Sequence, residues 1–431
     1  MRPATAIALA AAVFASATLG SALAQQQGFM QKFDDPAIQY YKGPHTDAVA
    51  KLMQGMADGT VTLTYEPSNG YLLSLLKALD VPLQSQLTVF SQTSFQASLI
   101  NEKNPRALYF NDNVAVGWVR GGNMEVAAED PRQGVIFYEV VQRAGEPPAF
   151  ERTQKCLQCH VSWDTFGVPG YTVLSTGPND AAGYATGGAS NDTTPFPMRW
   201  GGWYVTGKTG PMDHMGNVPI STPPAARPAH PPQLLSLRGQ FDLAGYPTPY
   251  SDVVALMTLE HQSRMVNYLT WIGWQARVDA EQAKANGLLT PPGAASGIPA
   301  DLRPIADDLV DYMLFVDEAP LPGPVEGTSG FTQYFSALGP ADAQGRSLRQ
   351  FDLHHWLMRY PCSYMIYAPI FDALPATAKA AIYERLWNVL SGQVHDPRYA
   401  ARLTLANRRA VVEILRATKK GLPSYFGLVT H

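Results

Sequence analysis

The sequence predicts an α+β protein, with an antiparallel β meander in the amino-terminal half and a mostly α-helical carboxy-terminal half that contains long Pro/Gly-rich loops. Up to about residue 141, β-branched and aromatic residues form short runs separated by turn sequences. Beyond about residue 250, apolar residues recur at helical spacing over much longer stretches. The chain also contains 36 Gly and 35 Pro, which indicates long irregular connections.

The first 24 residues have the pattern of a secretory signal peptide. Arg2 supplies the positive charge, residues 6–19 are apolar, and Ala22-Leu23-Ala24 is a small-x-small cleavage sequence before Gln25. The alternative is an uncleaved membrane anchor, for which the apolar run is short. No later segment is apolar enough to cross a bilayer. We therefore expect no membrane span after signal cleavage, and a periplasmic or otherwise exported location in a bacterium.

Residues 25–150 are expected to hold two helices and the meander. The apolar stripes predict helices at 46–57, starting at Thr46 or Asp47, and at 68–79. Runs of β-forming residues predict strands, separated by turn sequences rich in Asn, Asp and Gly. These strands are 87–90, 107–110, 114–119, 124–127 and 135–141.

Residues 151–249 form an aromatic and loop-rich region, and residues 250–431 are predicted to be helical. The first of these regions has a short strand near 171–175, an aromatic strand at 198–207 and a proline-rich loop at 219–249. A long helix is expected at 251–286, capped by Ser251 or Asp252. Further helices are predicted at 301–316, 348–358, 376–391 and 397–419.

The most specific motif is Cys156-Leu157-Gln158-Cys159-His160, the Cys-x-x-Cys-His attachment sequence of c-type haem. Two intervening residues let one helical turn present both thiols to the two porphyrin vinyl groups, and His160 then becomes an axial ligand of the iron. We predict one covalently bound haem c, held by Cys156, Cys159 and His160. Export agrees with this motif, because haem c is attached outside the bacterial inner membrane.

Two other interpretations of the cysteine pair remain open. A thioredoxin-like dithiol requires a βαβ context and does not use the histidine. A structural zinc site requires two more ligands, and Cys362 is the one remaining cysteine. Cys362 lies in an apolar stretch, where we expect a buried inert thiol in preference to a reactive or ligating one.

The opposite face of the haem decides which function is possible. If Met or His closes it, the iron suits outer-sphere electron transfer; if nothing closes it, small molecules can bind. Met215 is our candidate for the sixth ligand, in a loop bounded by glycine, and His214 and His261 are its rivals. Met198 and Met212 are weaker candidates, because each is equally explained by ordinary packing.

Two further residues are assigned to the haem pocket. Arg199 is the expected partner of a haem propionate, with a plain ion pair as the alternative. Trp200 follows it and is expected in the pocket wall. The other expected wall residues, for which a generic core is the alternative, are Trp163, Tyr171, Trp203 and Tyr204.

Composition limits the classes of partner. The net charge is -4 and charged residues make up 16% of the chain, so neither a nucleic-acid partner nor a polybasic membrane contact is indicated. A chain of this length far exceeds what is needed to enclose one haem, so a function beyond simple electron carriage has to be considered.

Several phrases resemble a family of exported bacterial mono-haem proteins that is identified only by a cytochrome c domain. The resemblance spans most of the mature chain, from about residue 60 to 390. The phrases are Pro105-Arg106-Ala107-Leu108-Tyr109-Phe110-Asn111-Asp112, the cysteine motif, Arg199-Trp200-Gly201-Gly202-Trp203-Tyr204-Val205-Thr206-Gly207, His214-Met215-Gly216-Asn217, Leu259-Glu260-His261-Gln262 and Arg359-Tyr360-Pro361-Cys362-Ser363-Tyr364. The family has no established reaction, so the resemblance implies haem binding alone.

Three functions therefore remain from the sequence. The first is an exported mono-haem c-type cytochrome that exchanges single electrons with a redox partner protein in the periplasm. The second is a haem-dependent oxidoreductase, peroxidase- or oxygenase-like, with His261, Glu260 or Arg199 as distal polar groups. The third is a haem-based sensor. Chain length favours the enzyme, whereas the single haem motif disfavours a self-contained dihaem peroxidase.

Overall fold

The computed structural model describes residues 32–179, 185–228, 230–287 and 298–429. The predicted signal peptide lies outside these residues. Within the described ranges, no helix has both the length and the apolar character that a membrane span requires.

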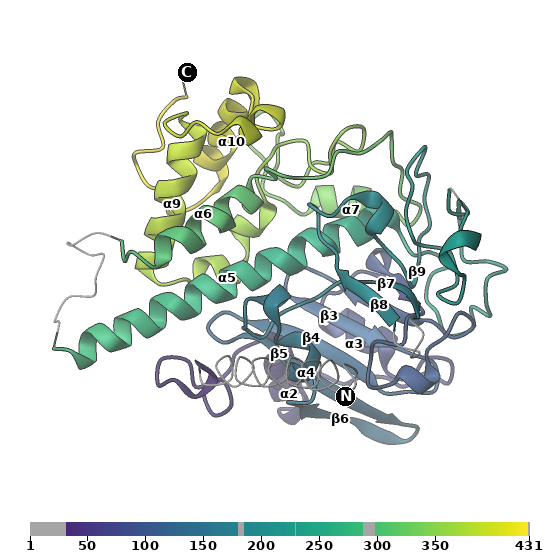
Figure 1. Cartoon of the computed structure of the whole chain (residues 1–431). Helices are drawn as coiled ribbons and strands as arrows, with labels where there is room; N and C mark the ends of the chain where they lie inside the picture. Colours follow the sequence, from purple (N-terminus) through teal and green to yellow (C-terminus); the bar gives the residue numbers. More distant parts are fainter. Residues whose placement is uncertain (1–31, 180–184, 229, 288–297, 430–431) are drawn as a thin grey trace, which may run out of the picture.

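A seven-stranded antiparallel sheet forms the amino-terminal half (Figure 1). The strand order is β6-β5-β4-β3-β2-β1-β9, so the predicted meander is confirmed and is extended by one strand at each edge. The strands are β1 (Leu87–Val89), β2 (Arg106–Phe110), β3 (Val114–Trp118), β4 (Met124–Asp130), β5 (Gly134–Arg143), β6 (Glu146–Arg152) and β9 (Trp203–Tyr204). A separate antiparallel pair consists of β7 (Leu174–Asn179) and β8 (Ala185–Ala189).

Side chains of Asn and Asp form the turns that set the strand register. Asn111 Oδ1 accepts hydrogen bonds from the backbone N–H groups of Asn113 and Val114, both at 2.9 Å, between β2 and β3. Asp130 Oδ1 does the same for Arg132 and Gln133 between β4 and β5. Such local bonds stabilise turns independently of the rest of the fold, which is why the turn positions were predictable.

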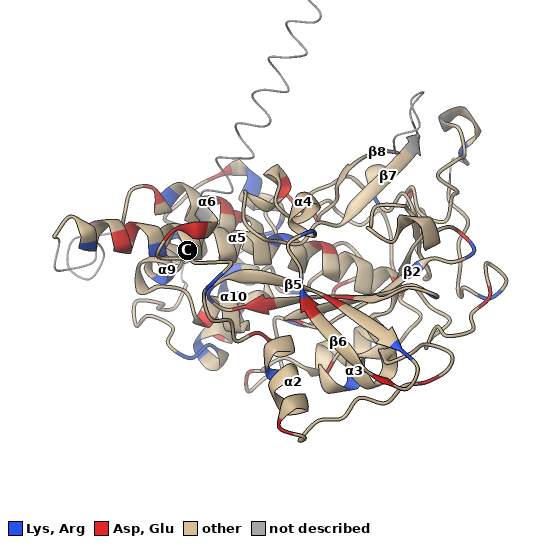
Figure 2. Ribbon diagram, turned by 90° about the horizontal axis from the view of Figure 1, so that it is seen from below, with Lys and Arg blue, Asp and Glu red and all other residues tan. Residues whose placement is uncertain are grey.

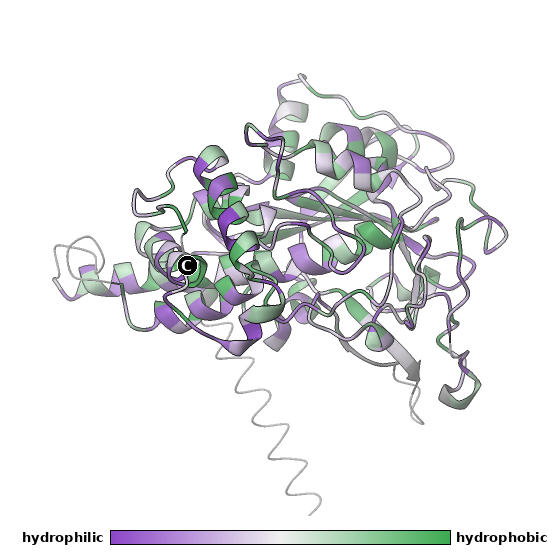
Figure 3. Ribbon diagram, turned by 90° about the horizontal axis from the view of Figure 1, so that it is seen from above, coloured by the Kyte–Doolittle hydropathy of each residue, from purple (hydrophilic) through white to green (hydrophobic). Residues whose placement is uncertain are grey.

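The carboxy-terminal half is mostly helical, and the predicted α+β class is confirmed. Its helices are α5 (Val253–Ala285), α6 (Leu302–Met313), α7 (Phe331–Ala337), α8 (Pro369–Asp372), α9 (Ala376–Leu390) and α10 (Leu405–Thr418). Two earlier helices, α2 (Ala48–Ala57) and α3 (Leu72–Ala78), pack with the sheet region, and α4 (Leu157–His160) carries the cysteine motif. Figure 3 shows hydrophilic and hydrophobic residues alternating along most helices, as expected when one face is buried.

Three sequence predictions of secondary structure are wrong in detail. Residues 348–358 do not form a helix: Phe351 bridges Met358 around a turn in which Leu353 has a φ of 60°. The aromatic strand at 198–207 shortens to β9, because positive φ angles at Trp200 and Gly202 interrupt the extended backbone. The helix expected at 397–419 divides into a 3-10 turn at Pro397–Ala401 and α10.

Helix α5 is the element that joins the two halves. It crosses between the sheet on one side and α6, α9 and α10 on the other (Figure 1), and it is buried along most of its length up to Trp274. Its N-cap Asp252 is fully buried, and its Oδ1 accepts from the N–H groups of Val254 and Ala255 at 2.8 and 3.1 Å. Its Oδ2 accepts from two backbone N–H groups and one hydroxyl, those of Thr328 and Ser329. One carboxylate therefore fixes both the start of α5 and the segment before α7.

Basic and acidic residues are interspersed over the surface (Figure 2). The densest example is Arg398, which pairs with Asp311, Asp317 and Asp396 at 2.8–2.9 Å. Exposed pairs of this kind contribute little stability individually. The buried core and the capped helices therefore carry most of the stability.

We expect Asp252→Ala to lower the free energy of unfolding by about 2–4 kcal/mol, because it removes a helix cap and leaves buried N–H groups unpaired. Chemical denaturation checks this value. Thr404→Ala, at the N-cap of α10, is the matched control, because Thr404 accepts a single bond from Asn407 at 3.3 Å. Equal losses of unfolding free energy in the two variants would contradict the role of Asp252 in fixing both α5 and the segment before α7.

Candidate functional site

The cysteine motif lies on a single helical turn that follows the edge strand β6. Cys156 caps α4, and the N–H of His160 donates to the carbonyl oxygen of Cys156 at 2.9 Å. A spacing of three residues on a helix places Cys156 and Cys159 on the same side. Cys156 is half-buried, Cys159 is exposed, and neither thiol is in a disulfide.

The imidazole of His160 is oriented by a backbone carbonyl. Its Nδ1 lies 2.9 Å from the oxygen of Gly170, and the N–H of Gly170 donates back to the oxygen of His160 at 3.0 Å. A proton on Nδ1 leaves the lone pair of Nε2 free to bind a metal, the arrangement usual for metal-bound histidine. Burial lowers the pKa of His160 and favours this neutral form.

Helix α5 holds the loop that orients His160. Asn267 accepts a hydrogen bond from the N–H of Tyr171 at 2.9 Å and donates one to the oxygen of Tyr171 at 2.8 Å. A Cβ atom at Gly170 would lie 2.2 Å from Asn267 Oδ1, so the close approach requires glycine. Asn267 therefore fixes the backbone to which His160 is bonded.

A cavity of about 520 Å³ opens beside the motif. Its volume lies within the roughly 300–1,000 Å³ typical of ligand and cofactor sites. The sheet forms its floor, and loop 171–174 with α5 forms the opposite wall. Its lining includes Cys156, Cys159, His160, Arg106, Leu108, Phe110, Glu125, Phe137, Tyr171, Thr172, Val173, Leu174, Trp203, Leu259 and Ser263.

Small residues leave space at the centre of the sheet face that forms the cavity floor. Ala115 and Ala127 stand opposite each other on β3 and β4, between Phe110 on β2 and Phe137 on β5. Gly117 lies in the adjacent row. Because these positions have little or no side chain, the sheet leaves space for a flat group. The cavity, the two unpaired thiols and the free Nε2 of His160 together fit a covalently attached haem.

The structure bears on the two alternatives for the cysteine pair. Burial is the main cause that raises the pKa of Cys156 to about 11, the opposite of the lowered pKa of a redox-active cysteine. The described residues contain no cluster of three or more His, Cys, Asp or Glu side chains placed to hold a metal ion. A haem iron takes four ligands from the porphyrin, so this result concerns the zinc alternative and not haem. Cys362 is fully buried, and burial raises its pKa to about 12.

No family model, curated protein or solved structure matches the chain.

Arg199 and Trp200 lie outside the lining of the cavity. Arg199 is buried, its Nη1 lies 3.1 Å from Glu260 Oε2, and its other nitrogens donate to the oxygens of Asp192 and Thr194. These contacts match the plain ion pair that was the alternative for Arg199. Trp200 is fully buried against Phe196. Of the other aromatic residues predicted in the wall, Tyr171 and Trp203 line the cavity, whereas Trp163 and Tyr204 do not.

His261 belongs to the same buried polar network as Arg199. Its Nδ1 lies 2.8 Å from Asp192 Oδ2 and its Nε2 lies 2.8 Å from Ser363 Oγ. This Asp–His–Ser connectivity is that of a hydrolase triad, but all three residues are buried and none lines the cavity. Both ring nitrogens are engaged, so iron ligation by His261 would require one of these hydrogen bonds to break and the imidazole to reach the cavity.

His214 and Met215 lie behind the cavity wall. The ring of His214 packs edge-on against Trp200 with ring centroids 5.0 Å apart, and burial lowers its pKa to about 4. Met215 Sδ is 3.8 Å from the hydroxyl of Ser175. Ser175 follows Leu174, which lines the cavity, and successive strand residues point to opposite sides. Met215 as the sixth ligand therefore stays a prediction, and one that requires β7 to move.

Arg106 and Glu125 are cavity residues that the sequence does not predict as site residues. Arg106 Nη2 lies 2.5 Å from Glu125 Oε2, on the sheet face that forms the floor. The alternation of side chains along a strand could have indicated Arg106. It places Arg106 on the same face of β2 as Leu108 and Phe110, so that a charged residue lies among apolar ones. The register that brings it to Glu125 was not readable from sequence.

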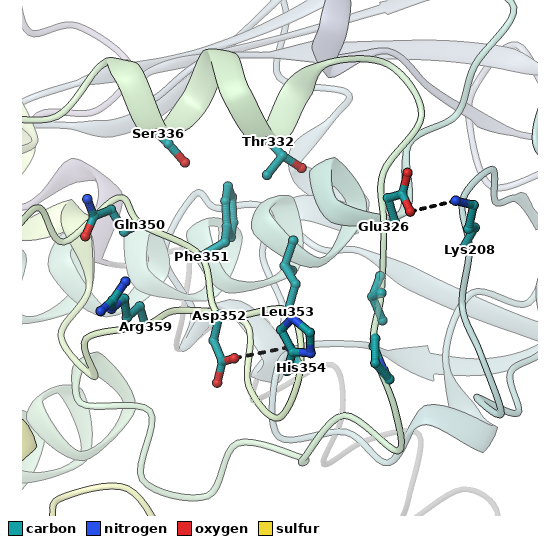
Figure 4. A pocket seen from close by; sticks show the side chains of 12 residues that line it. Lys208, Glu326, Thr332, Ser336, Gln350, Phe351, Asp352, Leu353, His354 and Arg359 are labelled. Carbon is teal, nitrogen blue, oxygen red and sulfur yellow. Dashed lines mark hydrogen bonds and ion pairs between the residues drawn. The ribbon is translucent and has the colours of Figure 1, made fainter.

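A second, more open cavity of about 620 Å³ lies beside α7. Figure 4 shows the ion pair of Lys208 and Glu326, at 2.7 Å, at one end and Arg359 at the other. Thr332 from α7 and His354 from the following loop region also line it. No residue of the cysteine motif reaches it, so we assign the functional site to the first cavity.

We expect Met215→Leu, His214→Asn and His261→Asn to leave the visible spectrum of the haem-loaded protein unchanged, because none of the three side chains lines the cavity. Absorption spectra of both oxidation states check this. His160→Ala is the positive control, since it removes the oriented imidazole and should shift the spectrum. A shift in one of the three variants would identify that residue as an iron ligand.

Proposed function

We propose that this protein is an exported mono-haem c-type cytochrome that transfers electrons to or from a redox partner protein in the periplasm. The observation that carries the proposal is the orientation of His160. Its Nδ1 is bonded to Gly170 at the edge of a cavity that Cys156 and Cys159 also line. Haem c would supply a reversible one-electron change at the iron.

The residues of the chain have separate roles in this proposal. Cys156 and Cys159 would hold the porphyrin covalently, and His160 would bind the iron through Nε2. The apolar floor and wall exclude water, which raises the reduction potential of a buried haem by disfavouring the extra charge of the oxidised state.

The side of the cavity that contains the cysteine motif lies at the protein surface. Cys159 is exposed, and Phe95, which lines the cavity, is 58% exposed. A partner that docks here would approach the porphyrin edge without crossing the core. This supports electron exchange with another protein.

We expect the purified protein, expressed with a haem c attachment system, to keep haem colour after denaturation. Cys156→Ala and Cys159→Ala should each remove one thioether bond, which a pyridine haemochrome spectrum detects as a shifted band. Cys362→Ser is the matched control and should keep the wild-type band. Loss of all haem from wild type on denaturation would refute covalent attachment.

A second candidate is a haem-dependent oxidoreductase or sensor whose second iron face is open to a small ligand. The observation that favours it is the lining of the cavity. Among the described residues of that lining, His160 carries the one imidazole and none carries a thioether. Candidate protein ligands for a second face would have to come from outside this lining.

Carbon monoxide distinguishes the two candidates. An open face predicts high-spin ferric iron and rapid binding of carbon monoxide to the ferrous protein. A closed face predicts low-spin iron in both oxidation states and no binding. Visible spectra of the wild type, recorded with and without the gas, decide between them. The open-face result would replace the electron-carrier proposal with the second candidate, and the separation of Met215 from the cavity by β7 is a further observation in favour of that candidate.

A further inference from the structure

We infer that Arg106 is a carboxylate-binding residue of the cavity. The inference rests on the proposed function in one respect, because the carboxylate is either a propionate of the bound haem or a free organic carboxylate. Arg106 is the one Lys or Arg among the described residues that line the cavity. Most of that lining is apolar, and the paired carboxylate of Glu125 offsets the charge of Arg106, so Arg106 can orient a ligand through its unpaired Nε.

The guanidinium group lies flat on the sheet floor over Gly117. A Cβ atom at Gly117 would come within 2.4 Å of Arg106 Nη2, 2.7 Å of Nε and 2.9 Å of Cζ. Gly117 occupies a strand, where glycine has no conformational advantage and weakens the sheet. The close approach of Arg106 explains why a glycine is needed there.

Glu125 holds one end of Arg106. Its Oε2 lies 2.5 Å from Nη2, and its Oε1 accepts a hydrogen bond from the hydroxyl of Ser94 at 3.0 Å. Arg106 Nε is buried and has no hydrogen-bond partner among the described residues. Because Arg106 lines the cavity, this N–H is available to donate to a ligand bound there.

A carboxylate matches the free donors better than other anions do. A guanidinium presents parallel N–H groups at the spacing of two carboxylate oxygens. A phosphate dianion would normally recruit more than one cation, and the described lining offers one. Arg106 and Glu125 line the same cavity as Cys156 and His160. The bound carboxylate would therefore belong to a molecule that lies against the cysteine motif.

The first experiment measures the reduction potential of the haem-loaded protein. Arg106→Leu should lower the midpoint potential, because a nearby cation stabilises the less positive reduced haem. Gly117→Ala keeps the charge but displaces the guanidinium, and it should shift the potential in the same direction by a smaller amount. Arg143→Leu is the matched control: it also removes one Arg charge, but from a side chain that is 70% exposed and lies outside the cavity lining.

The second experiment adds benzoate, a flat organic carboxylate. If the partner is a haem propionate, benzoate leaves the spectrum unchanged while the potential shifts as above. If the partner is a free carboxylate, benzoate perturbs the spectrum, and Arg106→Leu weakens its binding about tenfold to a hundredfold, as expected for a charged hydrogen-bonded pair. Benzamide, which is uncharged, is the ligand control.

The inference is overturned if Arg106→Leu and Arg143→Leu match in both the potential and benzoate binding. If the protein carries no haem, the proposed function fails separately. Benzoate binding to the haem-free protein, followed by tryptophan fluorescence because Trp203 lines the cavity, then decides the role of Arg106. Binding lost in Arg106→Leu but kept in Arg143→Leu supports it, and no difference refutes it.

Discussion

The two hydrogen bonds between the side chain of Asn267 and the backbone of Tyr171, one accepted and one donated by Asn267, are the constraint on which the candidate site depends. They hold the loop whose Gly170 oxygen fixes the imidazole of His160. Because Asn267 lies on α5, the orientation of His160 is tied to the helix that both halves of the protein pack against. A carbonyl acceptor at Nδ1 also adds no charge, so the imidazole remains neutral and its Nε2 remains available.

The buried network around Arg199 shows how residues with catalytic character can have a structural role. Glu260 and Arg199 pair, and His261 joins Asp192 to Ser363. Buried charges of this kind are tolerated only when they are paired and hydrogen-bonded, and removal of one partner is strongly destabilising. The network connects the loop after β8 to α5 and to the Ser363 segment. It thus supports the far side of the wall that faces the cavity.

Local signals explain what the sequence could predict. The side chains of Asp47 and Asp252 accept hydrogen bonds at the starts of their helices, and the side chain of Asn111 accepts them in a turn. In each case the donor and the acceptor are only a few residues apart in the sequence. The cysteine motif is equally local. Arg106 was not predictable as a cavity residue, because its contact with Glu125 depends on the register of three strands. The helix predicted at 348–358 does not form for a similar reason. The backbone there is hydrogen-bonded in a turn whose ends, Phe351 and Met358, pair with each other.

The cavity explains why so long a chain surrounds one cysteine motif. Its floor comes from strands that precede the motif, and its opposite wall comes from loop 171–174 and α5, which follow it. Neither half alone encloses the space. The wall also carries Thr172 and Ser263, whose buried hydroxyls have no hydrogen-bond partner among the described residues. With the unpaired Nε of Arg106 on the floor, polar atoms without a partner among the described residues line the cavity on both sides, where a ligand can bond to them.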